Sequence, residues 1–593
     1  MIRLRHLSFA VLSIAAFAAA QQGPAPADSL PASTWAMASF AGFDRCGEAV
    51  GGHRAAKLLK SFYDGLPQDV REQRVVAMLE QVAAQLREGE QQTPLRVAAL
   101  RGFARRPMVL GIGRPTILGW APSLALVVDE GNSGQDLDAL LAQLAAARPE
   151  PTRLQKGSVA GLACTLVEGD GMPTLYAVHE AGTFVFTNSE GYLREILAVK
   201  RGEQPSISSA THLGAQRARL QEQPLVEVFV NASTMAPMFA PFLPYETADF
   251  GRALGIESFG GAYLAAGPSG EGTVETLDLQ IAGAKDGLLK AALSGQVDFE
   301  AARYFDKETV AFAALRIDAN ALPEAFDRML ALLPREAARD MRRDVTREFL
   351  RGFRGAGITD AEVEELFGSM HGSITAGFSF GTAPAPIPGV TAVLRLRDVA
   401  AATRWLDRVR NATVEQGLQW KVRMQGDTTI HYCSAPISGE GGIELTPSYA
   451  IHDGNLVIGS TTKVVLDALK QRADESTSLF RETDFTVAML AEEGAMGLVH
   501  LRPGRLCERR WGLAETWVLP QIDANQEELG FSSEDLPEPE DIAAALGTST
   551  VSLTCDGDGL RLRMRGNLGL GGVAACFCVL ADEVLARANA KTF

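Results

Sequence analysis

The chain has 593 residues, 46% of them apolar and 22% charged, which is typical of a folded protein and excludes a disordered one. This length is greater than one domain with a single hydrophobic core usually has, and it predicts about three to four folded units. The 72 acidic and 56 basic residues give a formal net charge of −16. Because so acidic a chain repels phosphate backbones and anionic lipid headgroups, nucleic acid is not expected as a partner.

Residues 1–20 predict a signal peptide. The segment MIRLRH supplies positive charge, an apolar run follows, and three alanines precede Gln21 as in a cleavage site. An uncleaved membrane anchor is the alternative, although the run is short for a spanning helix. Residues 21–33, QQGPAPADSLPAS, are predicted to form a flexible leader. We therefore expect an exported protein, periplasmic or secreted, with no integral membrane segment after cleavage.

Residues 34–300 and 305–593 share short blocks in the same order. The stretch YAVHE from Tyr176 recurs as YAIHD from Tyr449, and PLVEVFVNAS from Pro224 recurs as AMGLVHLRPG. A fixed order of matched blocks, with drift only in loops, is the pattern of an internal repeat. The two ranges are therefore predicted to be homologous repeats produced by a tandem duplication.

Each repeat is expected to open with a strand, at 35–40 and at 310–317. Helices should follow, since apolar residues recur at helical spacing within 70–86 and 337–353. The middle of the first repeat predicts strands at 124–128, near 159–167, at 174–179 and at 183–187, with helices at 136–147 and 191–199. Short turns between strands favour antiparallel pairing. The predicted fold class is α+β, with two tandem homologous halves that each carry a mostly antiparallel sheet covered by helices.

A His-acid pair occurs once in each half, as His179-Glu180 and His452-Asp453. Each pair stands at the end of a predicted strand, just before a turn that contains glycine. A duplicated catalytic or metal site is one interpretation of this recurrence. A duplicated hairpin is the other, and we favour it, because polar residues and glycine are what a tight turn requires.

The stretch GFSFG at 377–381 matches the Gly-x-Ser-x-Gly pattern of a nucleophile elbow. That chemistry needs a helix directly after the serine, and the following TAPAPIPGV does not start one. We therefore favour a glycine-rich strand end. If the protein is nevertheless a hydrolase, Ser379, His371 and Asp398 are the candidate catalytic residues, because they lie near one another in the chain.

No motif for a metal or a phosphate-bearing cofactor occurs in the chain. There is no GxxxxGK[ST] loop, no HExxH and no paired CxxC, and the eight histidines are scattered. Of the seven cysteines, Cys164 and Cys433 fall in matched strands and are expected to be small buried side chains. Cys576 and Cys578 are likewise expected to be buried thiols. No cofactor and no metal site is predicted.

Two segments resemble a known family. Residues 30–36 read LPASTWA, and residues 388–398 read PGVTAVLRLRD. This phrase and strand, in this order and spacing, resemble large exported bacterial proteins of the type called domain of unknown function 3352. The first half departs from the pattern, since Asp129-Glu130 stand where the second half has Arg397-Asp398. The resemblance implies export and brings no activity, cofactor or catalytic residue.

Three functions are compatible with this sequence. We favour an exported, non-catalytic protein that acts as a binding or envelope-associated scaffold, with an unknown protein or an apolar ligand as its partner. The absence of a dense catalytic motif and the matched halves support it. A hydrolase with a site assembled from scattered residues between the halves is the first alternative. A periplasmic carrier that holds an apolar ligand in a groove between sheet and helices is the second.

Overall fold

A computed structural model represents the fold. It describes residues 26–66, 105–115, 122–129, 141, 152–169, 173–180, 182–210, 212–220, 223–239, 259–270, 272–281, 295–316, 327, 330–331, 335–336, 338–343, 359, 362, 365, 368–380, 389–415, 417–436, 444–492, 494–529, 531–556, 559–567 and 569. The predicted signal peptide, the apolar stripe at 70–86, most of the stripe at 337–353, most of the helix at 136–147, and Cys576 and Cys578 lie outside these residues.

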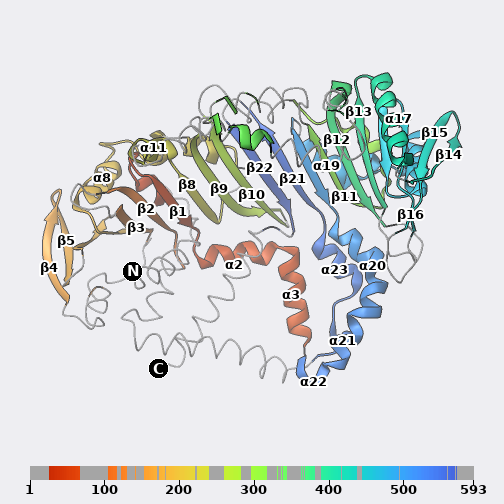
Figure 1. The fold of residues 1–593 in the computed structure, drawn as a ribbon. Helices are drawn as coiled ribbons and strands as arrows, with labels where there is room; N and C mark the ends of the chain where they lie inside the picture. The colour runs from red at the N-terminus through yellow and green to blue at the C-terminus, as the bar shows by residue number, and fades with distance from the viewer. Residues whose placement is uncertain are drawn as a thin grey trace.

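One large antiparallel sheet runs through the molecule (Figure 1). Its strands are β1 (Ala36–Phe40), β8 (Val226–Val230), β9 (Phe259–Ser269), β10 (Gly272–Ile281), β11 (Thr309–Arg316), β12 (Met370–Ser379), β13 (Gly389–Leu396), β14 (Trp420–Gln425), β15 (Thr428–Cys433), β18 (Ser448–His452), β19 (Asn455–Gly459), β20 (Gly497–Leu501), β21 (Ser549–Cys555) and β22 (Gly559–Gly566). Their order is β1-β8-β9-β10-β22-β21-β20-β11-β12-β13-β19-β18-β15-β14.

A second antiparallel sheet lies beyond β1. Its strands are β2 (Met108–Pro115), β3 (Pro122–Asp129), β4 (Thr152–Val159), β5 (Leu162–Gly169), β6 (Leu175–Glu180) and β7 (Thr183–Thr187), in the order β2-β3-β7-β6-β5-β4. The amide of Trp35, just before β1, donates to the carbonyl of Ile112 in β2 at 2.7 Å. The short strands β16 (Ala435–Pro436) and β17 (Glu444–Leu445) pair separately.

The α+β class and the mostly antiparallel sheet are confirmed, but the expectation of one sheet in each half is wrong. Strand β10 of the first half pairs with β22 of the second over eight residue pairs, from Thr273↔Gly566 to Gln280↔Gly559. Each of these strands would otherwise be a sheet edge with unpaired backbone N–H and C=O groups. Pairing satisfies both edges, and the two halves therefore share one sheet.

Strand order is the same on both sides of the β10–β22 pair. Outward from the pair, the order is β10, β9, β8, β1 on one side and β22, β21, β20, β11 on the other. Farther out, the order β2-β3-β7-β6-β5-β4 of the first half corresponds to the order β12-β13-β19-β18-β15-β14 of the second. In each inner set of four, the first strand in the chain lies farthest from the junction and the last lies at it.

Helices cover the sheet from two sides. Those of the first half are η1 (Pro26–Ser29), α2 (Phe43–Gly52), α3 (Arg54–Gly65), α8 (Glu190–Lys200), α9 (Ile207–Ala210), α10 (Leu213–Ala218) and α11 (Ala232–Phe239). Those of the second half are η5 (Phe299–Tyr304), α17 (Val399–Glu415), α18 (Thr462–Ala473), η6 (Glu475–Thr477), η7 (Leu479–Arg481), α19 (Thr483–Ala491), α20 (Pro503–Trp517), α21 (Leu519–Ala524), α22 (Gln526–Leu529), η8 (Ser533–Asp535) and α23 (Pro539–Leu546).

The two main hydrophobic cores lie on one face of the sheet. Leu193 of α8 and Tyr263 of β9 both belong to the first core, and Phe485 of α19 packs on Phe312 of β11 in the second. Tyr263 belongs to the same cross-strand row as Arg561, and Phe312 belongs to the row of Arg565. Because residues four apart on a strand point to the same side, both cores share this side, which we call the helical face.

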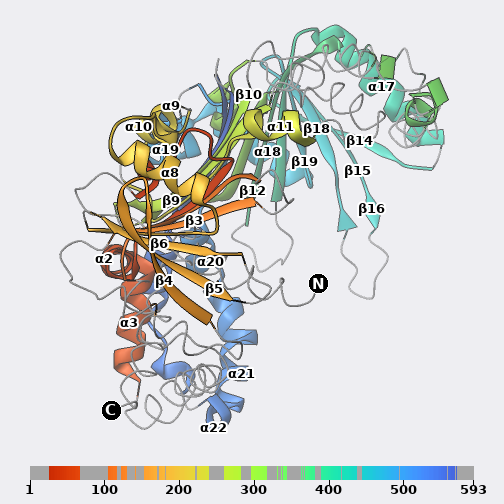
Figure 2. The same cartoon turned by 90° about the vertical axis from the view of Figure 1, so that its left-hand side faces the viewer.

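The opposite side, which we call the open face, is covered only in part. Phe43 of α2 packs on Phe40 of β1, with ring centroids 5.6 Å apart. Helices α2 and α3 lie beside α20, α21 and α22 below the sheet in both views (Figures 1 and 2). Phe62 of α3 contacts Phe531, which precedes η8, at 5.6 Å. Aromatic packing therefore joins α3 of the first half to the segment before η8 of the second half on this side.

Local signals placed several elements correctly. Strand β7 has the predicted bounds, β1, β6 and β11 lie within a residue of theirs, and α8 begins one residue before 191 and ends one after 199. The single strand expected near 159–167 is wrong, since a hairpin turn interrupts it at Ala160-Gly161. Both turn residues have positive φ, 51° and 83°, and glycine adopts that region without steric cost.

The two His-acid pairs flank hairpin turns, but not in the same register. In the first hairpin Glu180 pairs with Thr183 across the turn, whereas in the second His452 pairs with Asn455. The two histidines therefore differ by one position relative to their turns, and a one-residue shift reverses the face of a strand side chain. This difference argues against a duplicated site and agrees with the hairpin interpretation.

Candidate functional site

The three candidate catalytic residues do not meet. His371 and Ser379 lie on β12 eight residues apart, which is about 26 Å along an extended strand. The Asp398 carboxylate accepts a hydrogen bond from the Ala401 amide at 2.9 Å and so caps α17. Burial, and then the charges of Arg316, Arg395 and Arg397, lower the pKa of His371. This grouping is therefore not an active site.

The GFSFG stretch ends a strand, as predicted. Ser379 is the last residue of β12 and pairs with Gly389 of β13. A Cβ atom at Gly377 would lie 2.2 Å from the ring of Phe305, so the glycine is required by close aromatic packing. The glycine pattern thus has a packing explanation.

A row of aliphatic side chains crosses the open face. Its members stand directly opposite one another in successive ladders, so they point to the same side. They are Leu264, Leu277, Leu562, Leu553, Leu315, Ile374 and Leu394, with Gly497 between Leu553 and Leu315. From β9 to β13 the row spans about 34 Å, at about 4.8 Å between strands. Leu264, Leu562 and Ile374 are 43%, 41% and 38% exposed.

A second row runs beside the first. It contains Ala266, Glu275, Met564, Val551, Val499, Ala313, Ala376, Ala392 and Ile458. Glu275 is its only ionisable side chain and is buried. We call the two rows together the apolar surface. At its ends α2 covers the strands near Phe40, and Leu406 of α17 packs in the same cluster as Leu394. Monomeric proteins rarely leave so long a run of aliphatic side chains exposed.

The helical face of the same junction is charged. Residues 560–565 read LRLRMR, so the leucines and the methionine of β22 point to the open face and the three arginines to the helical face. Arg561 donates through Nε to Asp278 at 2.6 Å. Arg565 Nε lies 3.7 Å from the carboxylate of Glu492, which accepts from Ser552 at 2.6 Å. Between these two arginines stands Arg563, opposite Thr276.

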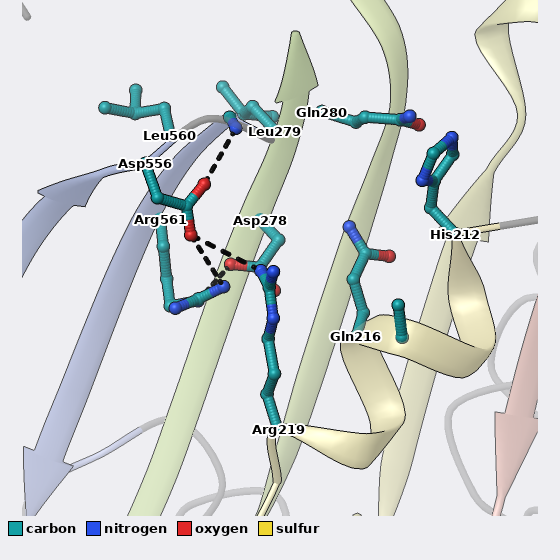
Figure 3. Close-up of a pocket in the computed structure, with 11 residues that line it drawn as sticks. His212, Gln216, Arg219, Asp278, Leu279, Gln280, Asp556, Leu560 and Arg561 are labelled. Carbon is teal, nitrogen blue, oxygen red and sulfur yellow. Dashed lines mark hydrogen bonds and ion pairs between the residues drawn. The ribbon is translucent and has the colours of Figure 1, made fainter. Parts of the chain in front are cut away.

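A small polar pocket lies beside Arg561 (Figure 3). Asp556 lies between Arg561 and Arg219, at 3.9 and 3.5 Å, while Gln216 of α10 and His212, the residue before this helix, form the far wall. Burial raises the pKa of Asp278 and the charge of Arg561 opposes that change. The pocket has a volume of about 30 Å³, which accommodates one or two water molecules rather than a substrate. Its ion pairs join the two halves of the chain.

A larger pocket opens between α19 and the ends of β10 and β22. Its volume is about 490 Å³, within the range of small-molecule sites, and its lining includes Asp484, Glu492, Thr550 and Arg565. The buried His500 connects two of these residues. Its Nδ1 lies 3.0 Å from the Thr550 hydroxyl, and its Nε2 lies 3.6 Å from Asp484.

Asp484 is held as a carboxylate. Burial would raise its pKa, but the proximity of His500 and the charge of Arg502 lower it to about 2. Arg502 donates to this carboxylate through Nε at 2.9 Å. The order acid, imidazole, hydroxyl is the arrangement that activates a hydroxyl nucleophile, and here the hydroxyl lies on the wall of a pocket.

Sequence reasoning found neither the apolar surface of the open face nor the arginine row of the helical face. The alternation LRLRMR was the one available signal, because it assigns the two kinds of side chain to opposite faces.

Among the described residues, no group of three or more His, Cys, Asp or Glu side chains could hold a metal ion. No described helix combines the length and the apolarity that crossing a bilayer requires.

Comparison with protein-family models finds no match, and comparisons with curated proteins and with solved structures find none either. The resemblance to the domain of unknown function 3352 type therefore stays a prediction. What the fold and the surfaces define is an α+β protein with one long antiparallel sheet, whose main cores lie on one face and whose other face carries an aliphatic surface that helices cover only at its ends.

Proposed function

We propose that the protein is an exported, non-catalytic binding protein built from two copies of one α+β unit, and that its apolar surface binds the hydrocarbon chain of an amphiphile. The observation that carries the proposal is the exposed row of Leu264, Leu562, Leu315 and Ile374 on one face of a shared sheet. The palindromic strand order supports the duplication. This function combines the scaffold and carrier hypotheses drawn from the sequence.

A hydrocarbon chain suits this surface better than a peptide does. The face of a sheet offers aliphatic side chains but no free backbone donors or acceptors, since the ladders consume them. An extended peptide there would lose hydrogen bonds to water without replacement, whereas an alkyl chain loses none. The surface also lacks the exposed Tyr, Trp and Arg side chains that concentrate binding energy in protein interfaces.

The test is binding of a fluorescent long-chain fatty acid to the purified protein. The double variant Leu264→Asp/Leu562→Asp is expected to weaken binding by roughly tenfold to a hundredfold. Each leucine is a little under half exposed, so covering both contributes about 1.5–3 kcal/mol. Val414→Asp, which changes an exposed aliphatic residue of α17, is the matched control.

The outcome can contradict the proposal in two ways. If the wild-type protein does not bind the fatty acid, the apolar surface is not a hydrocarbon site. If the double variant binds as tightly as Val414→Asp, the fatty acid is bound elsewhere. Mass spectrometry of the protein purified from its source tests the same idea without a probe, because a retained amphiphile should be extracted with organic solvent.

Hydrolysis at the larger pocket is a second candidate function, favoured by the Asp484–His500–Thr550 chain. In this reaction His500 would accept the Thr550 proton, and Asp484 would stabilise the resulting imidazolium. Thr550→Val removes the hydroxyl at nearly constant volume and is expected to lower any esterase activity by at least about 100-fold. The control is Thr548→Val, which changes another hydroxyl in the pocket lining. Equal activity in the two variants would exclude Thr550 as the nucleophile.

A further inference from the structure

Arg563 occupies a central position on the helical face of the junction. It stands opposite Thr276 of β10 and Ser552 of β21, with Arg561 and Arg565 two residues away on the same side of β22. Its side chain is partly buried, and its Nε is buried without a hydrogen-bond partner. Among the described residues, no hydrogen bond or ion pair involves its guanidinium.

The charges around Arg563 do not balance. Asp278 is engaged by Arg561, and Glu492 is engaged by Arg565 and Ser552. Each of the two buried carboxylates therefore pairs with one of the outer arginines. The central arginine, Arg563, has no carboxylate of its own. Burial, followed by the proximity of Arg565, lowers the pKa of Arg563, and the charges of Glu492 and Asp278 oppose this change. A guanidinium that is partly desolvated and has no ion-pair partner is stabilised when an anion binds it.

We infer that Arg563 anchors a binding site for a small oxyanion, a carboxylate or a phosphate group, between α10 and α19. A guanidinium is a planar fork of N–H donors that matches the two oxygens of either group. Arg561 and Arg565 add positive potential on both sides. Two neighbours of Arg563, Arg565 and Thr550, line the larger pocket. It lies on the opposite face from the apolar surface and does not depend on the proposed function.

The test uses the full chain and two probes, inorganic phosphate and acetate, each titrated against chloride at constant ionic strength. The wild-type melting temperature is expected to rise saturably with at least one probe, because a ligand that binds the folded state stabilises it. Arg563→Gln is expected to weaken that binding tenfold or more, since a charge-assisted hydrogen bond is lost. Arg342→Gln, which removes an exposed partner of Asp327, should respond as the wild type does.

A second readout separates an anion site from a structural role. Without phosphate or acetate, Arg563→Gln is expected to melt at the same or a higher temperature than the wild type, because a partly buried charge without an ion-pair partner has been removed. Two results would overturn the proposal. One is a wild-type protein that responds to neither probe. The other is an Arg563→Gln variant that responds as the wild type does.

Discussion

Replacing Arg217 by methionine is expected to lower the free energy of unfolding by about 3–5 kcal/mol, because it leaves the buried carboxylate of Glu227 without a counter-charge. Arg217 of α10 donates to both oxygens of Glu227, from Nε at 2.8 Å and from Nη2 at 2.5 Å. Tyr263 and Ser39 donate to the same carboxylate at 2.8 and 3.0 Å. This cluster attaches α10 to the sheet.

The measurement is denaturant unfolding of Arg217→Met beside two further variants. Arg194→Ala breaks an exposed pair with Glu190 one turn away on α8 and is expected to cost less than about 0.5 kcal/mol. Adding Glu227→Gln to Arg217→Met should recover much of the loss, since the unpaired charge is then gone. An equal free energy of unfolding for Arg217→Met and Arg194→Ala would show that the buried ion pair contributes no more to stability than the exposed one.

Asp484→Asn is expected to lower stability by about 2 kcal/mol at pH 6. Because the pKa of Asp484 is lowered from 3.8 to about 2, the folded protein binds its proton less readily than the unfolded chain does. The resulting stabilisation is fully present above pH 4 and is lost as the pH falls toward 2. The difference between wild type and variant should therefore shrink steadily below pH 4.

Urea unfolding at several pH values between 6 and 2.5 measures this difference. Asp467→Asn is the control, since Asp467 pairs with Lys463 on the exposed side of α18 and should contribute less than about 0.5 kcal/mol. A difference between wild type and Asp484→Asn that stays constant over this pH range would contradict the proposed role of the carboxylate. In that case the effect of the substitution would come from packing.

Elements with a local cause were predictable. The hairpin around 183–187 and the helix at 191–199 follow from alternation, a glycine turn and Ser189, whose hydroxyl caps α8 by accepting from the Tyr192 amide. The turn at Ala160-Gly161 was missed because an uninterrupted run of apolar residues on both sides resembles one strand. Period and turn chemistry act within a few residues, so a sequence alone contains them.

The candidate surfaces depend on contacts between distant segments. Leu264 and Leu562 are nearly 300 positions apart and lie in one row only because β10 pairs with both β9 and β22. The Asp484–His500–Thr550 chain likewise requires β20 and β21 to be neighbours beneath α19. Scattered histidines and hydroxyls leave no spacing signal, which is why proximity in the chain selected Ser379, His371 and Asp398 instead.

The sequence by itself determined the α+β class, the antiparallel pairing and several element boundaries, because these follow from side-chain period and turn residues. Only the tertiary structure decided that β10 and β22 merge the halves into one sheet. That pairing determines which carboxylates lie near Arg561 and Arg565, and it leaves Arg563 without an ion-pair partner. It also leaves the leucine row of the open face exposed. Charge balance and burial depend on the neighbours of each residue, and the strand register selects these neighbours.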